Sequence, residues 1–381
     1  MEVNIAINNR DAPLTRATRM TTVAFIVNGS YDSAMGHRAR DLAVHLGHYD
    51  IRIAYRSPRK IISILRLLIF LSRVGPKVSY VFDISYSGVL AAGLYRLVFR
   101  NRLIVETGDA VVELARSTGS RGKLGLWLTR VLEKTAFRMA DRVVVRGSFH
   151  QEWLSQRGIH ADVIQDGVDT RSFTPKDATD LRAQYGLDGT LTMGLVGSSI
   201  WSEKLQMCYG WELVETLRLL KDTRVRGVMI GSGSGIPHLK ARCREYGIED
   251  SILFLDYVPY EQLPRYLNLI DVCLSTQTND LVGQFRTTGK LPLYLAAGRY
   301  VLASDVGEAA RVLERDMLVP YEGVKDEQYP SKLAARIGAI LAEPHLLARA
   351  SANIALARKY FDYSLLAQRA GRVIEAEITR A

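Results

Sequence analysis

A turn rich in glycine and threonine, residues 287–289, lies directly before Lys290 and opens a short apolar segment that Gly298 ends. A turn that leads into a helix presents backbone N–H groups that have no partner within the helix. The partial positive charge of that helix end and the ammonium of Lys290 together favour an anion. The sequence therefore predicts a seat for a diphosphate, contacted by Thr287, Thr288, Gly289, Lys290 and Leu291.

Apolar runs of strand length alternate with helical patterns through the first half of the chain. Residues 22–27 form a continuous apolar run that ends at Asn28 and Gly29, as a buried parallel strand does. This alternation predicts a doubly wound parallel sheet. We expect strands at residues 22–27, 51–55, 78–82, 102–106, 142–145 and 161–164, and helices at residues 39–46, 61–71, 88–99 and 122–139.

The same alternation restarts in the second half. A polar segment, residues 173–177, a small helix to Tyr185 and a turn at residues 186–189 separate the halves as an interdomain linker would. The sequence thus predicts an α/β protein with two tandem Rossmann-like domains facing across a cleft, where ligands bind beyond the carboxyl ends of the strands. The further strands are expected at residues 191–197, 226–231, 252–255, 272–275 and 300–303, and helices throughout residues 331–380.

Length and composition agree with two domains. The chain has 381 residues, of which 48% are hydrophobic and 24% charged, as in ordinary soluble globular proteins. We place the first domain at residues 20–172, joined by a C-terminal helix at residues 363–380, and the second at residues 190–360. Residues 1–19 are expected to form a flexible or peripheral segment.

The net charge of +10 indicates nucleic acid, an anionic membrane surface or an anionic substrate as partner. We expect no nucleic-acid partner, because no nucleic-acid-binding motif and no run of basic residues interleaved with aromatic ones is found. A generally basic surface that aids solubility explains the charge equally well. Arg56, Arg59 and Lys60 before the apolar segment 61–71 suggest a helix that docks on a membrane, although a half-buried helix with a basic entry explains this pattern better.

The cysteines and the N-terminal residues indicate the cellular compartment of the protein. The spacings of Cys208, Cys243 and Cys273 differ from any zinc pattern, and an odd number suits a reducing compartment with buried thiols. Residues 1–20 carry several charges and no signal-peptide core, and the segment 61–71 is too short to span a bilayer. We expect a cytoplasmic protein, with peripheral contact to the inner face of a membrane as a further option.

Four segments together resemble glycosyltransferase family 4, also described as glycosyl transferases group 1, whose two-domain fold is called GT-B. The resemblance covers about residues 23–361, and the C-terminal half carries the specific motifs. The four segments are residues 163–173 (VIQDGVDTRSF), 195–204 (LVGSSIWSEK), 256–272 (DYVPYEQLPRYLNLIDV) and 287–304 (TTGKLPLYLAAGRYVLAS).

The resemblance implies a site for a nucleotide-sugar donor in the second domain. Lys204 and Lys290 would hold the diphosphate, and the nucleotide base would lie near Tyr257 and Val258. Alternatively, both lysines are solvated surface residues, and Glu308 is a glutamate favoured by a helix N-terminus. The remaining family positions are Gly197 and Ser198 at the diphosphate and Glu308 at the donor sugar.

The chain departs from the family pattern at several positions, four of which lie between residues 166 and 293. Asp166 replaces an asparagine and keeps a turn former, and Leu205 replaces a glycine. Ser198 replaces the arginine that holds the diphosphate, for which Arg286 or Arg299 could compensate. Leu293 replaces the glutamate that holds the donor ribose, so Thr287 or Thr288 could take that role, or donor binding is weak or lost.

Two segments of the first domain supply candidate catalytic residues. Gly36 and His37 match the family loop after the first strand, which reaches the donor phosphate and the acceptor. His37 is equally explained as a residue at a helix start. The run Glu106-Thr107-Gly108-Asp109 follows a strand, with Gly108 where the family often has a histidine. Asp109 could orient an acceptor hydroxyl or act as a weak base, or it could simply cap a helix.

The sequence thus favours a retaining glycosyltransferase that moves a sugar from a nucleotide-diphosphate sugar to the hydroxyl of a glycan, lipid-linked or small-molecule acceptor. We expect no metal and no cofactor, because lysines replace the metal's charge and no Asp-x-Asp motif is placed for one. The resemblance implies His37, Asp109 and Lys290 as catalytic residues, with the leaving diphosphate helping to take the acceptor proton. The alternatives are a catalytically silent GT-B protein that binds a ligand or partner, a nucleotide-sugar epimerase or a phosphorylase.

Overall fold

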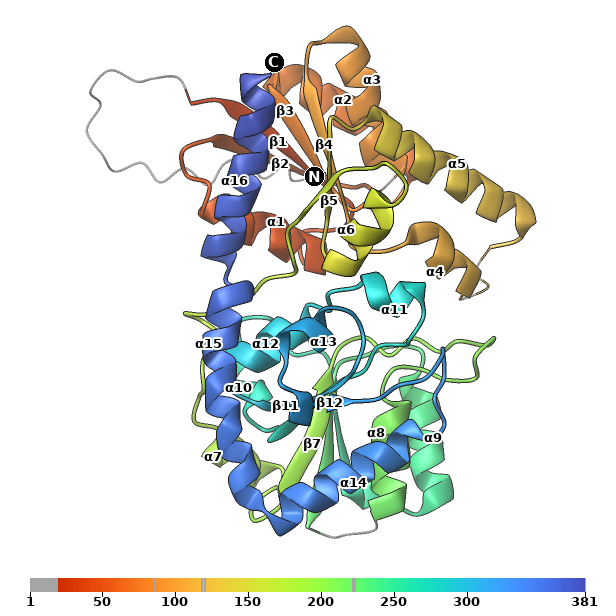
Figure 1. Cartoon of the computed structure of the whole chain (residues 1–381), viewed down its shortest axis with the longest axis vertical. Coiled ribbons are helices and arrows are strands. Elements are labelled where there is room, and N and C mark those ends of the chain that lie inside the picture. The colour runs from red at the N-terminus through yellow and green to blue at the C-terminus, as the bar shows by residue number, and fades with distance from the viewer. Residues whose placement is uncertain (1–19, 85, 118, 120, 221–223, 381) are drawn as a thin grey trace, which may run out of the picture. The chain divides into compact units, whose positions relative to one another are not determined.

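The computed structural model describes residues 20–84, 86–117, 119, 121–220 and 224–380 (Figure 1). It divides the chain into two compact units, which we call unit 1 (residues 1–166 and 363–381) and unit 2 (residues 167–362). The boundary therefore follows Asp166 rather than residue 172, and the expected linker lies within unit 2, where it contains helix α7 (Thr179–Gln184). The expected peripheral segment, residues 1–19, lies outside the described residues.

Unit 1 is built on a six-stranded parallel sheet with the order β2-β1-β3-β4-β5-β6. All the strands predicted for this half are present. Side chains alternate between the two faces of a strand, so Phe25 of the first strand packs toward one helical layer and Ile26 toward the other. The strands are β1 (Thr22–Val27), β2 (Asp50–Tyr55), β3 (Val78–Phe82), β4 (Arg102–Thr107), β5 (Arg142–Val145) and β6 (Ala161–Val163).

Helices cover both faces of this sheet (Figure 1). One face packs against α1 (Ala34–Val44) and α16 (Tyr363–Thr379), so the last helix of the chain returns to unit 1. The other face packs against α2 (Lys60–Val74), α3 (Tyr86–Val98) and α5 (Lys123–Met139). The sequence did not predict two short helices, α4 (Val111–Ser117) and α6 (Ser148–Ser155), and α1 ends at Val44 instead of at Gly47.

Unit 2 is built on a second six-stranded parallel sheet, with the order β12-β11-β10-β7-β8-β9. The predicted strands are again present. The short edge strand β12 was not predicted, because two residues carry no periodic pattern. The strands are β7 (Leu191–Val196), β8 (Val225–Ile230), β9 (Ile252–Leu255), β10 (Val272–Ser275), β11 (Tyr300–Ser304) and β12 (Leu318–Val319).

The helices of unit 2 enclose one continuous apolar core that includes all three cysteines, each of them a free and buried thiol. No helix in the described part of the chain is long and apolar enough to cross a membrane. The α-helices besides α7 are α8 (Trp211–Leu220), α9 (Ile236–Tyr246), α10 (Leu263–Leu267), α11 (Leu281–Phe285), α12 (Lys290–Ala296), α13 (Gly307–Val312), α14 (Tyr329–Ala342) and α15 (Ser351–Tyr360); single 3₁₀ turns occur at Glu249–Ser251, Arg315–Met317 and Pro344–Ala350.

Candidate active site

The strand order of each sheet reverses once along the chain. In unit 1 the reversal lies between β1 and β3, and in unit 2 between β7 and β10. The loops that leave the carboxyl ends of such a strand pair run in opposite directions, and the crevice between them is where open α/β sheets bind ligands. Each unit therefore has one preferred place for a ligand.

Lys290 occupies this place in unit 2. A Cβ atom on Gly197, directly after β7, would be 3.6 Å from both Cε and Nζ of Lys290. The Nζ atom also lies 3.6 Å from the centre of the Tyr209 ring. The Tyr209 hydroxyl donates a hydrogen bond of 3.1 Å to the carbonyl of Leu274 in β10. The aromatic ring thus holds the lysine between the carboxyl ends of β7 and β10.

The surroundings of Lys290 set its charge. Burial lowers the pKa of the Lys290 ammonium to about 8, the Glu212 carboxylate opposes this, and Arg286 lowers the pKa further. Glu212 is buried in the first turn of α8, and its Oε2 atom accepts the N–H of Gly210 at 3.1 Å. The sequence did not single out Glu212, since a glutamate in a first helical turn is common for reasons of the helix dipole alone.

The exchange Glu212→Gln is expected to shift the pH dependence of diphosphate binding to lower pH. The native ammonium is protonated below its pKa of about 8, so affinity for UDP should fall as the pH rises through that value. Removing the negative charge of Glu212 lowers the pKa of Lys290 further, so the variant should lose affinity at a lower pH. Calorimetric titration with UDP between about pH 6 and pH 9.5 measures this shift.

The matched control is Glu215→Gln on the same helix. The Glu215 carboxylate pairs with Arg218 at 2.9 Å and lies outside the surroundings of Lys290. Its pH profile should equal that of the native protein. Identical profiles for Glu212→Gln and the native protein would show that Glu212 does not set the charge of Lys290.

Glycine allows two loops to pack backbone against backbone beside Lys290. A Cβ atom on Gly231 would lie 2.2 Å from the carbonyl oxygen of Gly197, and one on Gly233 would lie 2.0 Å from that of Ser199. Both glycines have a positive φ, 136° and 143°, which also disfavours other residues. The run Gly231-Ser232-Gly233-Ser234-Gly235 after β8 is therefore part of this site, and its glycine spacing was a sequence signal that our prediction missed.

The other predicted donor residues lie on loops at the same edge of unit 2. Thr287 is buried, and Thr288 and Gly289 precede α12, whose first turn has no side-chain cap. Lys204 lies exposed in a turn closed by a bridge between Ser202 and Met207, so its contact with a diphosphate stays a prediction. The remaining positions are exposed Ser198, exposed Tyr257 and half-buried Val258 after β9, buried Leu291 in α12, and buried Glu308 in the first turn of α13.

Two arginines were candidates to replace the missing arginine at Ser198. Arg299 precedes β11 at the amino end of the strand, because Tyr300 pairs with Val272, the first residue of β10. It therefore lies at the opposite edge of the sheet from Lys290, and that option is wrong. Arg286 acts on the charge of Lys290 and is the cation that the structure brings to this edge.

In unit 1, Gly36 and His37 lie in the first turn of α1, after β1. A Cβ atom on Gly36 would be 2.1 Å from the carbonyl oxygen of Tyr31, so only glycine fits there. The Nδ1 atom of half-buried His37 lies 3.0 Å from a guanidinium nitrogen of Arg40. Gly36 is thus required by the packing of this loop, and the roles of Gly36 and His37 at the donor and acceptor stay predictions.

A buried ion cluster, formed by Arg38, Asp83, Glu106, Arg146 and Asp166, lies next to this loop. Arg38 and Glu106 are 1% and 0% exposed, and the Arg38 Nε atom lies 2.9 Å from Glu106 Oε1. Arg146 Nε approaches the same oxygen at 3.0 Å, and the Tyr80 hydroxyl donates to Glu106 Oε2 at 2.7 Å. Burial alone would raise the pKa of Glu106, but Arg38 and Arg146 hold it below its usual value. The carboxylate is therefore ionised.

Asp166, which stands where the family usually has asparagine, belongs to this cluster. Its carboxylate lies 3.8 Å from Arg38 and 3.7 Å from Arg146. Burial raises the pKa of Asp166, and the two arginines oppose that rise. Aspartate in place of asparagine at this position thus has a local explanation. Its carboxylate, together with that of Glu106, balances the charge of two buried guanidinium groups.

Arg146 also accounts for Gly108, which stands where the family often has histidine. A Cβ atom on Gly108 would lie 2.4 Å from a guanidinium nitrogen of Arg146. A histidine there would occupy the space that Arg146 fills. The two departures from the family pattern therefore go together, because the arginine that excludes the histidine is the one that pairs with Asp166.

Asp109 lines a cavity of about 230 Å³ at the carboxyl ends of β1 to β4, which include the switch point of unit 1. The first N–H of α4, that of Val111, donates to Glu133 at 3.1 Å, so Glu133 caps it instead of Asp109. A carboxylate that faces a polar cavity at this edge can bind a hydroxyl group. The polar residues around the cavity are Asn28, Arg56, Asp83, Tyr86, Ser87, Thr107, Asp109 and Arg121.

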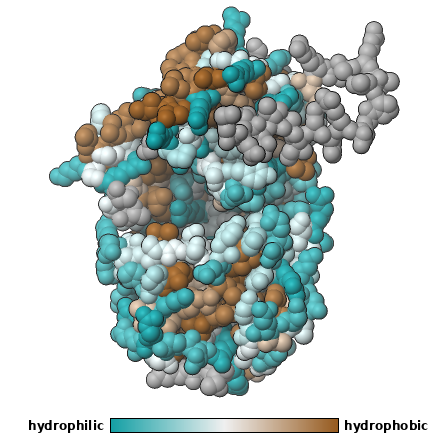
Figure 2. All heavy atoms as spheres, turned by 180° about the vertical axis from the view of Figure 1, so that it is seen from behind, coloured by the Kyte–Doolittle hydropathy of each residue, from teal (hydrophilic) through white to brown (hydrophobic). Residues whose placement is uncertain are grey.

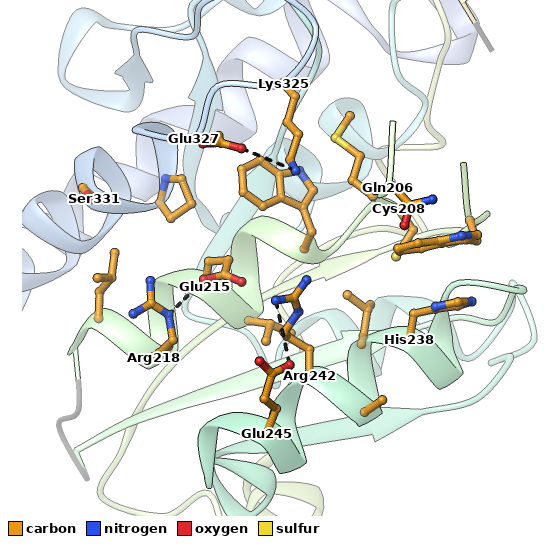
Figure 3. Close-up of a pocket in the computed structure, with 18 residues that line it drawn as sticks. Gln206, Cys208, Glu215, Arg218, His238, Arg242, Glu245, Lys325, Glu327 and Ser331 are labelled. Carbon is orange, nitrogen blue, oxygen red and sulfur yellow. Dashed lines mark hydrogen bonds and ion pairs between the residues drawn. The ribbon is translucent and has the colours of Figure 1, made fainter. Parts of the chain in front are cut away.

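A second cavity, of about 630 Å³, lies in unit 2 between α8, α9 and the segment before α14 (Figure 3). None of the predicted donor residues lines it. Its charged side chains are paired: Arg218 lies 2.9 Å from Glu215, and Lys325 lies 3.7 Å from Glu327. These walls offer an anion no excess of positive charge, so this cavity is a poorer candidate for a diphosphate site than the surroundings of Lys290.

Known proteins resemble this chain in the sequence of unit 2 and in the fold of both units. The model of the family described as Glycosyl transferases group 1 matches residues 193–343, the part of unit 2 that holds Lys290 and the loops around it. A sucrose-phosphate synthase from Thermosynechococcus elongatus has the same fold, with a TM-score of 0.75 and 16% identity over 95% of this chain and 100% of that chain. The chain therefore has the GT-B fold of these glycosyltransferases, and within unit 2 its sequence resembles the group 1 family.

Other solved structures share this fold. Anabaena HepE in complex with UDP-glucose has a TM-score of 0.72 and 16% identity, over 93% of this chain and 99% of that chain. The lipopolysaccharide outer core galactosyltransferase WaaB has a TM-score of 0.60 and 12% identity, over 94% of this chain and 100% of that chain. A search of curated protein sequences finds no significant match.

Proposed function

We propose that the chain is a glycosyltransferase, which moves a sugar from a uridine-diphosphate sugar to an acceptor hydroxyl with retention of configuration at the anomeric carbon. The observation that carries the proposal is Lys290, held over Gly197 by Tyr209 at the switch point of unit 2. The similarity to HepE, whose solved complexes contain UDP and UDP-glucose, supports uridine as the base. The low identity to HepE leaves the sugar itself to be identified by a donor screen.

The proposed chemistry depends on charge that develops on the leaving diphosphate. Lys290 supplies a full positive charge, and Arg286 adds a second cation close by. The uncapped turn of residues 287–289 supplies backbone N–H groups. With this charge provided by side chains, the reaction needs no metal ion or cofactor. The diphosphate leaves from the face on which the acceptor hydroxyl attacks and helps to take the acceptor proton.

We place the acceptor at the cavity around Asp109 in unit 1. Its polar lining suits a sugar or other polyol, and the Asp109 carboxylate would orient the reacting hydroxyl. His37, in the first turn of α1, is proposed as a further catalytic residue. A glycan, a lipid-linked sugar or a small molecule would each present such a hydroxyl. A cytoplasmic location, at the inner face of the membrane for a lipid-linked acceptor, fits three reduced and buried thiols.

A donor screen by nucleotide release tests the proposal. The purified protein is incubated with UDP-, GDP- and ADP-sugars, with and without a mixture of glycan acceptors, and released nucleotide is measured. We expect release from a UDP-sugar that increases with acceptor, and an anomeric proton coupling in the product equal to that of the donor. Release from GDP- or ADP-sugars alone contradicts the proposed base, and an inverted product contradicts the proposed stereochemistry.

The same screen separates the proposal from an isomerase. A nucleotide-sugar epimerase would convert the donor without acceptor, and the isomerised sugar would remain attached to UDP. Calorimetric titration with UDP, GDP and ADP completes the screen. No heat of binding with any of the three would contradict donor binding at Lys290.

A further inference from the structure

The helices on one face of unit 1 expose apolar side chains to solvent. Of the 18 large hydrophobic side chains that the described residues expose, eleven lie on α2, on α3 with the residue after it, and on α5. These three helices cover the same face of the sheet, and Figure 2 shows hydrophobic side chains gathered over that part of unit 1. We call this outward side of α2, α3 and α5 the three-helix face.

The exposed side chains follow helical spacing. On α5 they are Leu124, Trp127, Leu128 and Val131, which form a stripe at intervals of three and four residues, with Trp127 56% exposed. On α2 they are Ile61, Leu65 and Ile69, each four residues apart, whereas Leu67 and Leu71 of the same helix are buried in the core. Helix α2 therefore has two apolar stripes, one packed on the sheet and one facing water.

Such helices differ from those of an ordinary surface layer. A helix on a sheet normally buries one apolar stripe and presents polar residues to water. On α3, the outward positions Leu97 and Val98 are 79% and 76% exposed. Contiguous exposed apolar side chains on one face mark an interaction surface.

The charge of the three-helix face identifies the kind of partner. Helices α2 and α3 contain no acidic residue, and the single acid of α5, Glu133, turns inward to accept the N–H of Val111. Basic side chains lie between and beside the apolar stripes. The exposed ones are Arg66, Arg73, Lys123, Arg130, Lys134 and Arg138.

We propose that the three-helix face docks on the surface of an anionic lipid bilayer. Apolar stripes enter the boundary between headgroups and acyl chains, and the basic side chains lie at the level of the lipid phosphates. Trp127 suits that boundary, where amphipathic aromatic rings are favoured. Lysine and arginine place their charge at the headgroups while their alkyl stems cover apolar surface.

Other partners fit this face less well. A second copy of the chain would bring two basic faces together without an acid to pair them. A nucleic acid would satisfy the cations but would leave the apolar stripes of α2 and α5 against phosphates. An anionic bilayer is the partner that accommodates both the apolar stripes and the basic side chains. The inference goes beyond the transfer reaction, because bilayer binding is measured without donor or acceptor.

Co-sedimentation with lipid vesicles tests the proposal. The full chain is mixed with vesicles of phosphatidylcholine alone and with vesicles that contain about 30% phosphatidylglycerol. We expect binding to the anionic vesicles, at least about tenfold weaker binding to the neutral ones, and weakening as salt rises from about 0.1 to 0.5 M. Equal binding to both kinds of vesicle, or none, would overturn the proposal.

Two variants of the face and two controls locate the contact. The apolar variant Leu124→Ser/Trp127→Ser and the charge variant Arg66→Glu/Lys134→Glu should each weaken vesicle binding about tenfold or more. The controls are Val44→Ser, an exposed apolar residue on α1, and Lys240→Glu/Arg244→Glu on α9 of unit 2. Both controls should bind vesicles as the native protein does.

The same variants distinguish this proposal from the proposed function. Calorimetric binding of UDP should be unchanged in all of them, since none touches the surroundings of Lys290. Equal loss of vesicle binding in the controls and the face variants would show that overall basicity, not this face, attracts the membrane. A dimer that forms without lipid and dissociates in the apolar variant would assign the face to self-association instead.

Discussion

Replacing Lys290 by alanine is expected to reduce sugar transfer by about 100- to 1,000-fold, the loss that follows when one group stabilising the charge of a leaving group is removed. The ring of Tyr209 holds Lys290 at the switch point of unit 2. The Lys290 Nζ atom lies 3.6 Å from the position that a Cβ atom on Gly197 would take. Turnover of the identified donor, measured as released UDP, is the readout. Affinity for UDP should fall with turnover, because UDP carries the same diphosphate.

A second variant and a control separate loss of charge from loss of fold. Lys290→Met keeps a chain of similar length against the Tyr209 ring and removes only the charge, so it should be as inactive as Lys290→Ala. Its melting temperature should be unchanged or higher, since burial already disfavours the ammonium. The control Lys325→Ala, a lysine paired with Glu327 in the other cavity of unit 2, should retain native turnover. Undiminished turnover in Lys290→Met would contradict the assigned site.

Replacing Arg38 by methionine is expected to destabilise unit 1 by about 3–5 kcal/mol, the cost of removing one partner from a buried ion pair. The Arg38 guanidinium lies 2.9 Å from Glu106 and donates to the carbonyl of Ile164 at 2.8 Å. Without it, Arg146 alone must compensate Glu106, Asp83 and Asp166. The imbalance leaves buried carboxylates with too few cations.

Hydrogen exchange of the amides in β1, β3 and β4 is the measurement, because it reports on unit 1 without assuming that the two units unfold together. Arg38→Lys keeps the charge but loses the fork that reaches two acceptors, so it should be destabilised less than Arg38→Met. The control Arg116→Met removes an exposed pair with Glu113 and should change stability by no more than about 0.5 kcal/mol. Equal protection of the amides in Arg38→Met and the control would show that the cluster contributes little.

The order of the long elements could be read from the sequence, because each carries a periodic pattern of its own. The apolar run of β1 and the alternation that follows it needed no knowledge of distant residues. Short elements failed for the same reason: β12 has two residues, and α4 is seven residues long with a cap supplied by Glu133 on α5. A helix cap that another helix supplies cannot be recognised in the sequence around the capped helix.

In the candidate site, too, the local sequence identified some residues, whereas others could be placed only by the tertiary structure. Lys290 and its turn were found from local chemistry, and the sequence motifs around them point to the same donor site. Arg299, three residues after the end of the helix that Lys290 begins, was an equally good cation by spacing. Only the register of β11 on β10 places it at the opposite edge of the sheet.

By itself the sequence determined the class of fold and the two sheets, and it predicted a diphosphate site at Lys290, since propensity, periodicity and short motifs act between neighbours along the chain. The tertiary structure decided which distant groups set the charge at that seat. Glu212 is 78 residues from Lys290 by the difference of their numbers, and Arg38 is 68 residues from Glu106. Strand order and burial bring such groups together, and a carboxylate or guanidinium has its pKa set by the charges that surround it in space.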